Sequence, residues 1–387
     1  MDWNIYAQNY KNDQIAVFKE RYGISPRNDK FYFYYDESDN IRKFQLKGDN
    51  SSFNADYLSQ FTLGGLVSKN EITDTSLDFL YKQLNLQSNM KEIKSRHILN
   101  KKKKGISSFD SEKLSKFLKF LLDSEWYIHY TTVNVFYFGV VIDIIDSLIK
   151  YNVEKNNKYD INKADSLKSF LYLCMLAEID NWKNVLSKIN FPNLDDNGQQ
   201  MFLYHLHRNV YSFQDENYKQ ERLIILEYIE NNSKECELTF LISNKNHILI
   251  EDFTHYYLHK VFLYSDSYHI FDKENVIENK LEEMGIFNSE VSERFDFFES
   301  HKKRALQVSD ICMGTISILY RFLAENSFEM IKEYFNVLDA HSYEAENLKL
   351  LAKFINKTIK YDSCFITQMS NQIELERYKY FIEKFVY

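Results

Sequence analysis

Four acidic residues are the best candidates for chemistry in this sequence: Asp36, Glu92, Asp272 and Asp310. Asp36 directly follows five consecutive aromatic residues, 31–35, and Asp272 comes at the end of the short apolar run 268–271. Asp310 has apolar residues four positions before it and three positions after it in a predicted helix. A carboxylate among apolar neighbours must be paired, protonated or bound to a cation, because removing its charge from water is costly. We therefore expect these acids to form a site for divalent cations.

The chemistry expected of such a site is the hydrolysis of phosphodiester bonds. Two Mg²⁺ or Mn²⁺ ions about 4 Å apart need carboxylates from several chain segments; one ion activates a water and the other stabilises the leaving 3′ oxygen. Asp36 is the expected ligand of both ions, and all four acids are expected to be metal ligands and catalytic residues. Oxygen ligands without a Cys/His set favour Mg²⁺ or Mn²⁺ over zinc. The sequence has no GxxxxGKS/T, GxGxxG, GxSxG or HExxH motif, so these other chemistries are not indicated.

Each acid also has a structural alternative. Asp36 and the polar residues after it are typical of a turn, and Glu92 lies among lysines that suit surface ion pairs. Asp272 is in position to cap the helix predicted after it, and Asp266 also follows an apolar run and competes with Asp272 as the third acid. Asp310 has the weakest alternative, because aspartate is unfavourable inside a helix and caps nothing there.

Basic residues gather around two of the acids. The net charge of the chain is −8, which disfavours general binding to nucleic acid. Between Lys91 and Lys104, however, there are seven basic residues and one acidic residue, and a second basic group starts at Lys302. Local positive charge on an acidic protein favours a nucleic-acid groove, although four consecutive lysines also fit an ordinary solvated loop. The expected phosphate contacts are Lys94, Arg96, Lys101, Lys102, Lys103, Lys104, Lys302 and Lys303.

A mixed sheet is expected to position these residues. The aromatic run 31–35 suits a central strand covered on both faces. Residues 41–47 are predicted to be its hairpin partner, with Asp39 and Asn40 in the turn. Further strands are predicted at 61–67, 126–137, 238–242 and 268–271, and helices at 74–86, 111–122, 275–285 and 304–325. The fold class is therefore α/β, with a mixed sheet flanked by helices.

Several motifs of the sequence together resemble the DUF3800 family. They are YYDESDN at 34–40, EIKS at 92–95, HIFDKE at 269–274 and FFESHKKRALQVSDICMG at 297–314. The resemblance covers roughly residues 30–325 and implies a ribonuclease-H-like fold with Asp36, Glu92, Asp272 and Asp310 as its acidic set. The family commonly has Gly after DES, where this chain has Asp39, a residue type that tolerates a left-handed turn.

The helical periodicity and the resemblance together divide the chain. Residues 1–138 and 236–325 are expected to form the two parts of a ribonuclease-H-like core, with 139–235 as a helical insertion and 326–387 as a helical C-terminal extension. The four cysteines form no CxxC pair and the N-terminal segment lacks signal-peptide features, so a cytoplasmic protein with reduced thiols is expected. The most apolar segment is too short to predict a membrane span. The helical regions offer surfaces for a homo-oligomer or a partner subunit.

Two functions compete at this point. The first is a metal-dependent nuclease acting on DNA or RNA, and the resemblance suggests a role in anti-phage defence. The second is a catalytically inactive scaffold that keeps the ribonuclease-H-like fold and binds nucleic acid or a partner protein. Convergence of the four acids within metal-sharing distance in the structure would favour the nuclease, and acids scattered on different faces would favour the scaffold.

Overall fold

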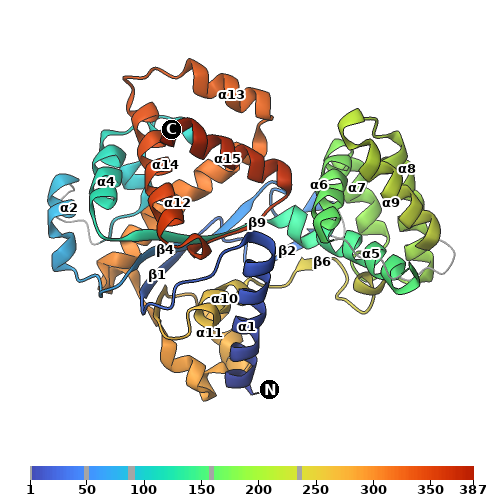
Figure 1. The fold of residues 1–387 in the computed structure, drawn as a ribbon, viewed down its shortest axis with the longest axis horizontal. Helices are drawn as coiled ribbons and strands as arrows, with labels where there is room; N and C mark the ends of the chain where they lie inside the picture. The colour runs from blue at the N-terminus through green and yellow to red at the C-terminus, as the bar shows by residue number, and fades with distance from the viewer. Residues whose placement is uncertain (1, 48–51, 86–91, 157–160, 233–237) are drawn as a thin grey trace.

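A six-stranded mixed sheet lies at the centre of the computed structural model, which describes residues 2–47, 52–85, 92–156, 161–232 and 238–387 (Figure 1). The strand order is β8-β7-β1-β4-β5-β9. The bounds are Tyr32–Ser38 for β1, Gln60–Ser68 for β4, Tyr127–Asn134 for β5, Tyr268–Asp272 for β7, Phe295–Phe298 for β8 and Ile366–Met369 for β9. The protein therefore has the mixed α/β architecture expected from its sequence.

Strand β1 lies inside the sheet because both faces of its aromatic run are buried. Tyr34 packs in the apolar cluster on one face, and Phe33 and Tyr35 pack in the cluster on the other. β1 pairs antiparallel with β4, and β4 pairs antiparallel with β5. On the other side of β1, β7 runs parallel to it and is followed by β8, while β9 extends the sheet beyond β5. The central strand predicted from residues 31–35 is confirmed.

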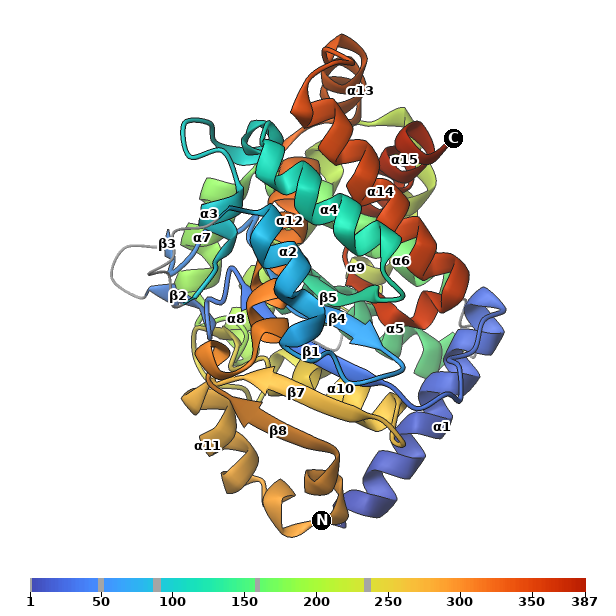
Figure 2. The same cartoon turned by 90° about the vertical axis from the view of Figure 1, so that its left-hand side faces the viewer.

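The first face of the sheet, to which Tyr34 belongs, is covered by α12 (Arg304–Glu325), α4 (Glu112–Asp123), α14 (Tyr343–Tyr361) and α15 (Gln372–Val386) (Figure 2). α12 packs directly on β1 and β4. A Cβ atom on Gly65 of β4 would overlap Ser309 Oγ of α12 and the carbonyl oxygen of Tyr34, so glycine permits this close approach. The helix predicted at 304–325 is confirmed, with the same bounds.

The second face, to which Phe33 and Tyr35 belong, is covered by α10 (Thr254–Leu263), α11 (Asn275–Glu283) and α1 (Trp3–Tyr22). The side chain of Asp2 caps the start of α1 by accepting hydrogen bonds from the N–H groups of Asn4 and Ile5. α1 ends at Gly23, which has a φ of 65°. The polar N-terminal segment therefore forms a helix with a defined cap at each end.

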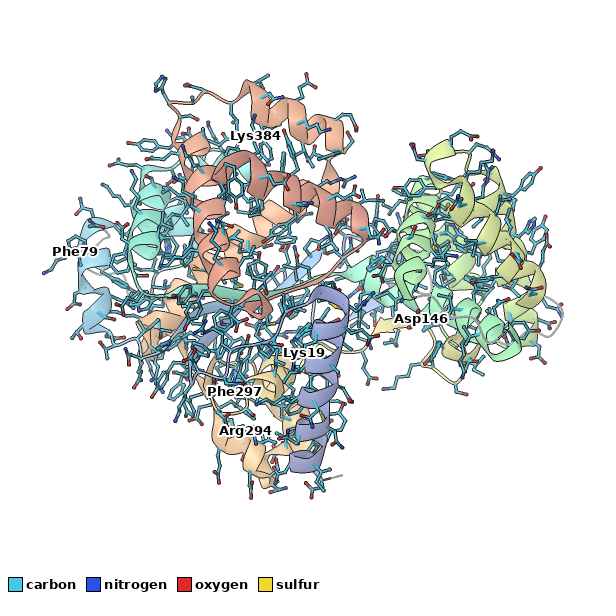
Figure 3. The ribbon with its side chains drawn as sticks, viewed as in Figure 1. Lys19, Phe79, Asp146, Arg294, Phe297 and Lys384 are labelled. Atoms are coloured by element: carbon cyan, nitrogen blue, oxygen red, sulfur yellow. The ribbon has the colours of Figure 1, made fainter. Side chains whose placement is uncertain are left out.

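Five helices form a separate group at the right of Figure 1: α5 (Ile142–Asn156), α6 (Ile161–Ala177), α7 (Ile179–Lys188), α8 (Asp196–Ser212) and α9 (Lys219–Asn232). Asp146 of α5 pairs with Lys168 of α6 at 2.7 Å within this group (Figure 3). A small sheet of β3 (Ser52–Phe53), β2 (Phe44–Lys47) and β6 (Ile248–Ile250) packs against α7. The helical group also contacts the rest of the protein through α6, where Tyr172 donates a hydrogen bond to Glu374 of α15 at 3.2 Å.

Two predictions about strands are wrong: the pairing of residues 41–47 with β1, although 44–47 do form a strand, and the strand at 238–242. Residues 41–47 are not the hairpin partner of β1: Asp39 and Arg42 both have positive φ values, 52° and 54°, and the chain turns away so that β2 joins the small sheet. Residues 238–242 contain a 3-10 helix, Thr239–Leu241, because the buried Leu238 and Leu241 are spaced by one helical turn. The short strands β6, β8 and β9 were not predicted.

The thiols and the helix lengths complete the description of the fold. Cys174, Cys312 and Cys364 are buried free cysteines, and Cys236 lies outside the described residues. In the described ranges, no helix is long and apolar enough to cross a membrane.

Candidate active site

Asp36 and Asp272 come at the same end of two neighbouring strands. β1 and β7 run parallel with Tyr35 opposite Phe271, so the next residues of the two strands are these two acids. Asp266, the competing candidate, precedes β7 at its opposite end and is exposed. The register of the sheet therefore favours Asp272 as the partner of Asp36.

Asp310 approaches the same end of β1 from α12. Ser309 Oγ accepts a hydrogen bond from Leu66 N at 3.3 Å and donates to Ala305 O at 3.0 Å, which holds this turn of α12 on the sheet. Asp310 Oδ2 accepts a hydrogen bond from Ser95 N at 2.7 Å. Asp310 is thereby tied to the segment that also contains Glu92.

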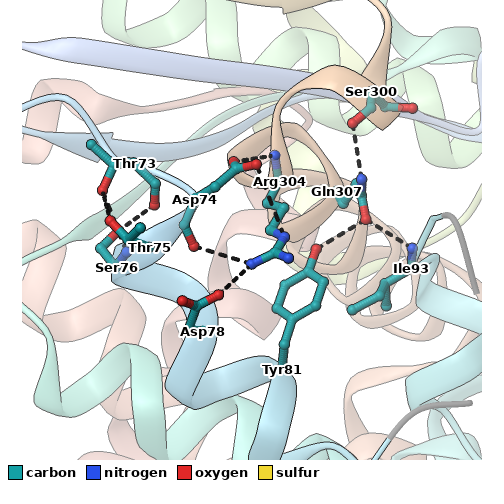
Figure 4. Close-up of polar contacts among 10 residues, drawn as sticks. All are labelled: Thr73, Asp74, Thr75, Ser76, Asp78, Tyr81, Ile93, Ser300, Arg304 and Gln307. Carbon is teal, nitrogen blue, oxygen red and sulfur yellow. Dashed lines mark hydrogen bonds and ion pairs between the residues drawn. The ribbon is translucent and has the colours of Figure 1, made fainter. Parts of the chain in front are cut away.

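Gln307 of α12 holds the segment that contains Glu92 (Figure 4). Gln307 Oε1 accepts hydrogen bonds from Ile93 N and from the Tyr81 hydroxyl, both at 2.9 Å. Gln307 Nε2 donates to Ser300 O at 3.0 Å. Ser300 Oγ in turn donates to Glu92 Oε1. Because both ends of the Gln307 amide are occupied, the backbone next to Glu92 is fixed against the start of α12.

The acids influence one another's protonation. Asp36 is only 7% exposed, and burial raises its pKa well above the usual range, with the charges of Asp310, Glu37 and Asp272 adding to the effect. Burial is also the main cause of the raised pKa values of Asp272 and Asp310, and the charge of Glu92 adds to both. Negative charge is therefore concentrated where four chain segments meet. We call Asp36, Glu92, Asp272 and Asp310 the acid cluster.

Lys94 places a positive charge beside the acid cluster. Its Nζ lies 3.1 Å from Glu92 Oε1. Burial alone would raise the pKa of Glu92, but hydrogen bonds from Ser300 and Lys94 outweigh it, and the pKa of Glu92 is lowered. Burial alone would lower the pKa of Lys94, but Glu92, Asp310 and Asp36 outweigh it, and this pKa is raised. The sequence predicts Lys94 as a phosphate contact, whereas its place within the acid cluster becomes evident only from the fold.

The donor set of the acid cluster fits a hard divalent cation. All four groups are carboxylates, and the main-chain hydrogen bonds to Asp36, Asp272 and Asp310 leave acceptor capacity on each of them. In the described part of the chain, however, no three His, Cys, Asp or Glu side chains are arranged to hold a metal ion. The acids thus come together from four segments, but binding Mg²⁺ or Mn²⁺ requires their side chains to move closer to one another.

Glu37 is a fifth acid near this site that the sequence did not identify as a candidate. Its side chain extends toward the second face of the sheet, where it accepts a hydrogen bond from the Tyr257 hydroxyl of α10. Burial raises the pKa of Glu37 to about 7, and the charges of Glu274 and Asp272 add to the effect, although the Tyr257 hydrogen bond opposes it. The alternation of side chains along a strand separates Glu37 from Asp36 although they are neighbours in sequence.

The predicted phosphate contacts differ in whether an acidic side chain already pairs with them. Lys103 pairs with Asp110 at 2.9 Å, and Lys302 and Lys303 pair with Glu299 and Glu71 at 3.4 and 3.0 Å. Lys91 lies outside the described residues. Four exposed cations make no ion pair within the described ranges: Arg96, Lys101, Lys102 and Lys104. All four lie between the start of α3 (Ser95–Ile98) and the start of α4, close in sequence to Glu92 and Lys94.

Comparisons with known proteins add no support to this interpretation, which is based on the residues of the chain alone. Searches of the chain against protein-family models, curated proteins and solved structures found no match. The resemblance to the DUF3800 family therefore stays a prediction from sequence motifs.

Proposed function

We propose that this protein is a metal-dependent nuclease that hydrolyses phosphodiester bonds of DNA or RNA. The observation that carries the proposal is the acid cluster itself, whose carboxylates come from β1, β7, α12 and the segment before α3. Asp310 and Asp272 raise the pKa of Asp36, and Glu92 raises the pKa values of Asp272 and Asp310. Concentrated, partly buried negative charge of this kind is typical of cation sites and of functional sites in general. A ribonuclease-H-like core is part of the proposal, and the central position of β1, antiparallel to β4 and parallel to β7, supports it.

The proposed roles follow from the chemistry of each residue. Bound Mg²⁺ or Mn²⁺ would supply an activated water and stabilise the leaving oxygen of the phosphodiester. Asp36, Asp272 and Asp310 are suited to hold the cation through their oxygens, with Glu92 kept ionised by Lys94 and Ser300. The ammonium of Lys94 lies next to the acids, in a place suited to attract a phosphate oxygen. The unpaired Arg96 and the loop lysines would contact the nucleic-acid backbone further from the acids.

The direct test is a cleavage assay. The purified full chain is incubated with single-stranded DNA, double-stranded DNA, RNA and an RNA–DNA hybrid in Mg²⁺ or Mn²⁺. We expect cleavage of at least one substrate and its loss when the metal is chelated. If none of the four is cleaved in either metal, the nuclease proposal is wrong for the isolated protein.

A second candidate is supported by one specific observation. No three metal-ligating side chains in the described residues are already arranged around a cation position. This favours an inactive scaffold that binds nucleic acid or a partner through the same surface. Such a scaffold would bind nucleic acid equally well with and without divalent metal, and isothermal titration with Mn²⁺ would detect no binding at the acid cluster.

The loop lysines provide a test of nucleic-acid binding that does not depend on catalysis. We expect the triple variant Lys101→Gln, Lys102→Gln, Lys104→Gln to bind all sequences more weakly and to show a smaller salt dependence. Each lost phosphate contact should reduce the log–log slope by roughly 0.7 to 0.9. Fluorescence anisotropy in Ca²⁺, which prevents cleavage, measures the slope. Lys103→Gln is the matched control, because Asp110 already occupies that ammonium. An unchanged slope in the triple variant would identify the run as an ordinary solvated loop.

A further inference from the structure

A cavity of about 490 Å³ lies on the second face of the sheet, the face opposite α12. α1 forms one wall with Tyr10, Gln14 and Phe18, which follow one another at intervals of four residues. α10 and the edge strand β9 form further walls, and Figure 1 shows α1 and α10 close to β9. Because the acid cluster faces α12, this cavity is separate from the candidate active site.

The side chains of α1 that face the cavity are incompletely packed. Tyr10, Gln14 and Phe18 are only half-buried, although they lie on the inner side of the helix. The cavity is open to solvent, because the lining residues Val17 and Tyr22 are 39% and 60% exposed. Its volume lies within the range of about 300 to 1,000 Å³ that is usual for small-molecule sites. The size of the cavity therefore suits a bound small molecule.

The walls are electrically neutral. Among the described residues that line the cavity, none is Asp, Glu, Lys or Arg. Burial lowers the pKa of the lining residue His259 well below its usual value, so its ring is uncharged at neutral pH. A charged ligand would lose its hydration here without gaining an opposite charge, which is costly. A neutral ligand does not have this cost.

A chain of hydrogen-bonding groups runs along one wall. Lys260, which lies behind the wall, donates from Nζ to Thr367 Oγ1 at 3.2 Å. Thr367 Oγ1 lies 3.4 Å from His259 Nε2, and His259 Nδ1 lies 2.7 Å from the Tyr10 hydroxyl. The Tyr10 hydroxyl also lies 3.5 Å from His255 Nε2, and this long contact can be replaced by a polar group on a ligand.

We propose that this cavity binds an uncharged small molecule built on a planar ring system. Aromatic side chains line it on several sides: Tyr10 and Phe18 from α1, Tyr256 from α10 and Phe138 from the segment after β5. Aromatic walls favour planar rings, and a few polar groups then fix the orientation of the ligand. The Tyr256 hydroxyl is also buried without a hydrogen-bond partner among the described residues, a further polar group on this wall. This proposal does not depend on the proposed nuclease activity.

A matched pair of ring compounds tests the proposal. Indole is an uncharged bicyclic ring, and indole-3-acetate presents the same ring with a carboxylate. By ligand-observed NMR on the full chain at neutral pH, we expect indole to bind with a dissociation constant on the order of 1 mM, as for other small fragments. We expect indole-3-acetate to bind about tenfold more weakly or worse, because its charge finds no partner.

Variants that fill the cavity locate the binding site. Gln14→Trp and Met369→Trp place a large side chain on two different walls, and each should weaken indole binding about tenfold or more by occupying the space. Val337→Trp, at a position 75% exposed at the end of α13 (Phe328–Val337), is the matched control and should bind indole as the wild type does. A melting curve establishes that each variant is folded, and two filling positions keep the test decisive if one variant fails to fold. Absence of indole binding, equal binding of both probes, or unchanged binding in a folded filling variant would overturn the proposal.

Discussion

Asp36→Asn is expected to abolish cleavage in Mg²⁺ or Mn²⁺ while leaving the melting temperature within a few degrees of the wild-type value or raising it. The carboxylate of Asp36 is 7% exposed and faces the charges of Asp310, Glu37 and Asp272. An amide of the same shape removes this repulsion but also removes the negative charge that a divalent cation requires. The variant should therefore lose activity without losing stability.

The pH dependence of stability provides a second measurement for the same variant. The pKa of Asp36 in the folded protein is above the value of about 3.9 in an unfolded chain, so the folded state binds this proton more tightly. The contribution of Asp36 to the free energy of unfolding without metal is then largest below about pH 4 and is lost as the pH rises through the folded-state pKa. Asp36→Asn should reduce this loss, as measured by urea denaturation in a chelator across the acidic to neutral range.

Asp266→Asn is the matched control for both measurements. Asp266 is exposed beyond the opposite end of β7, so its substitution should change neither cleavage nor the pH dependence. Wild-type cleavage by Asp36→Asn would remove Asp36 from the proposed site. A large loss of stability in Asp36→Asn would instead indicate that the carboxylate has a structural partner.

Gly65→Ala is expected to cause a large loss of stability. The new Cβ would overlap the side chain of Ser309 and the carbonyl oxygen of Tyr34, and the latter belongs to the backbone of the neighbouring strand. Relief requires α12 to move away from the sheet and the backbone of β1 to shift, at a cost of about 3 kcal/mol. Because Ser309 precedes Asp310, the same movement should displace one member of the acid cluster and reduce any cleavage activity.

Gly23→Ala is the control that measures the cost of replacing a glycine where the new Cβ atom overlaps nothing. Gly23 has a positive φ, but a Cβ atom there meets nothing within 4 Å. Its replacement should cost only about 1 kcal/mol and leave activity unchanged. Urea denaturation of both variants gives the comparison. Equal stability losses in Gly65→Ala and Gly23→Ala would contradict the packing argument.

The sequence was most informative where one residue pattern determines one element. The run 31–35 predicted β1 because both faces of the strand are apolar, and the apolar periodicity of 304–325 predicted α12 with its observed bounds. The hairpin prediction failed because Asp39 and Arg42 adopt left-handed backbone conformations that turn the chain away. β9 was not predicted because its four residues depend on pairing with β5, a contact between distant parts of the chain.

The candidate site could be predicted only in part for the same reason. Asp36 and Asp310 are conspicuous because their immediate neighbours are apolar. The choice between Asp272 and Asp266 depends on the pairing of β7 with β1, which local sequence does not encode. The position of Lys94 within the acid cluster depends on Gln307 and Ser300, residues about 200 positions further along the chain, on α12 and just before it. Interactions across such separations are determined by the complete fold.

Helices α5–α9 lie between β5 and β7 in the chain, and this order determines when the acid cluster can assemble during synthesis. Asp36 and Glu92 leave the ribosome early, but β1 gains its parallel neighbour only after the whole helical group has been made. The bond from the Tyr35 hydroxyl to His269 already spans 234 residues. Long-range pairing of this kind forms late, because the intervening chain must first be closed into a loop. A nascent chain or a truncated product that ends before Asp310 therefore has no complete acid cluster, so any activity of the cluster is confined to chains that have been almost fully translated.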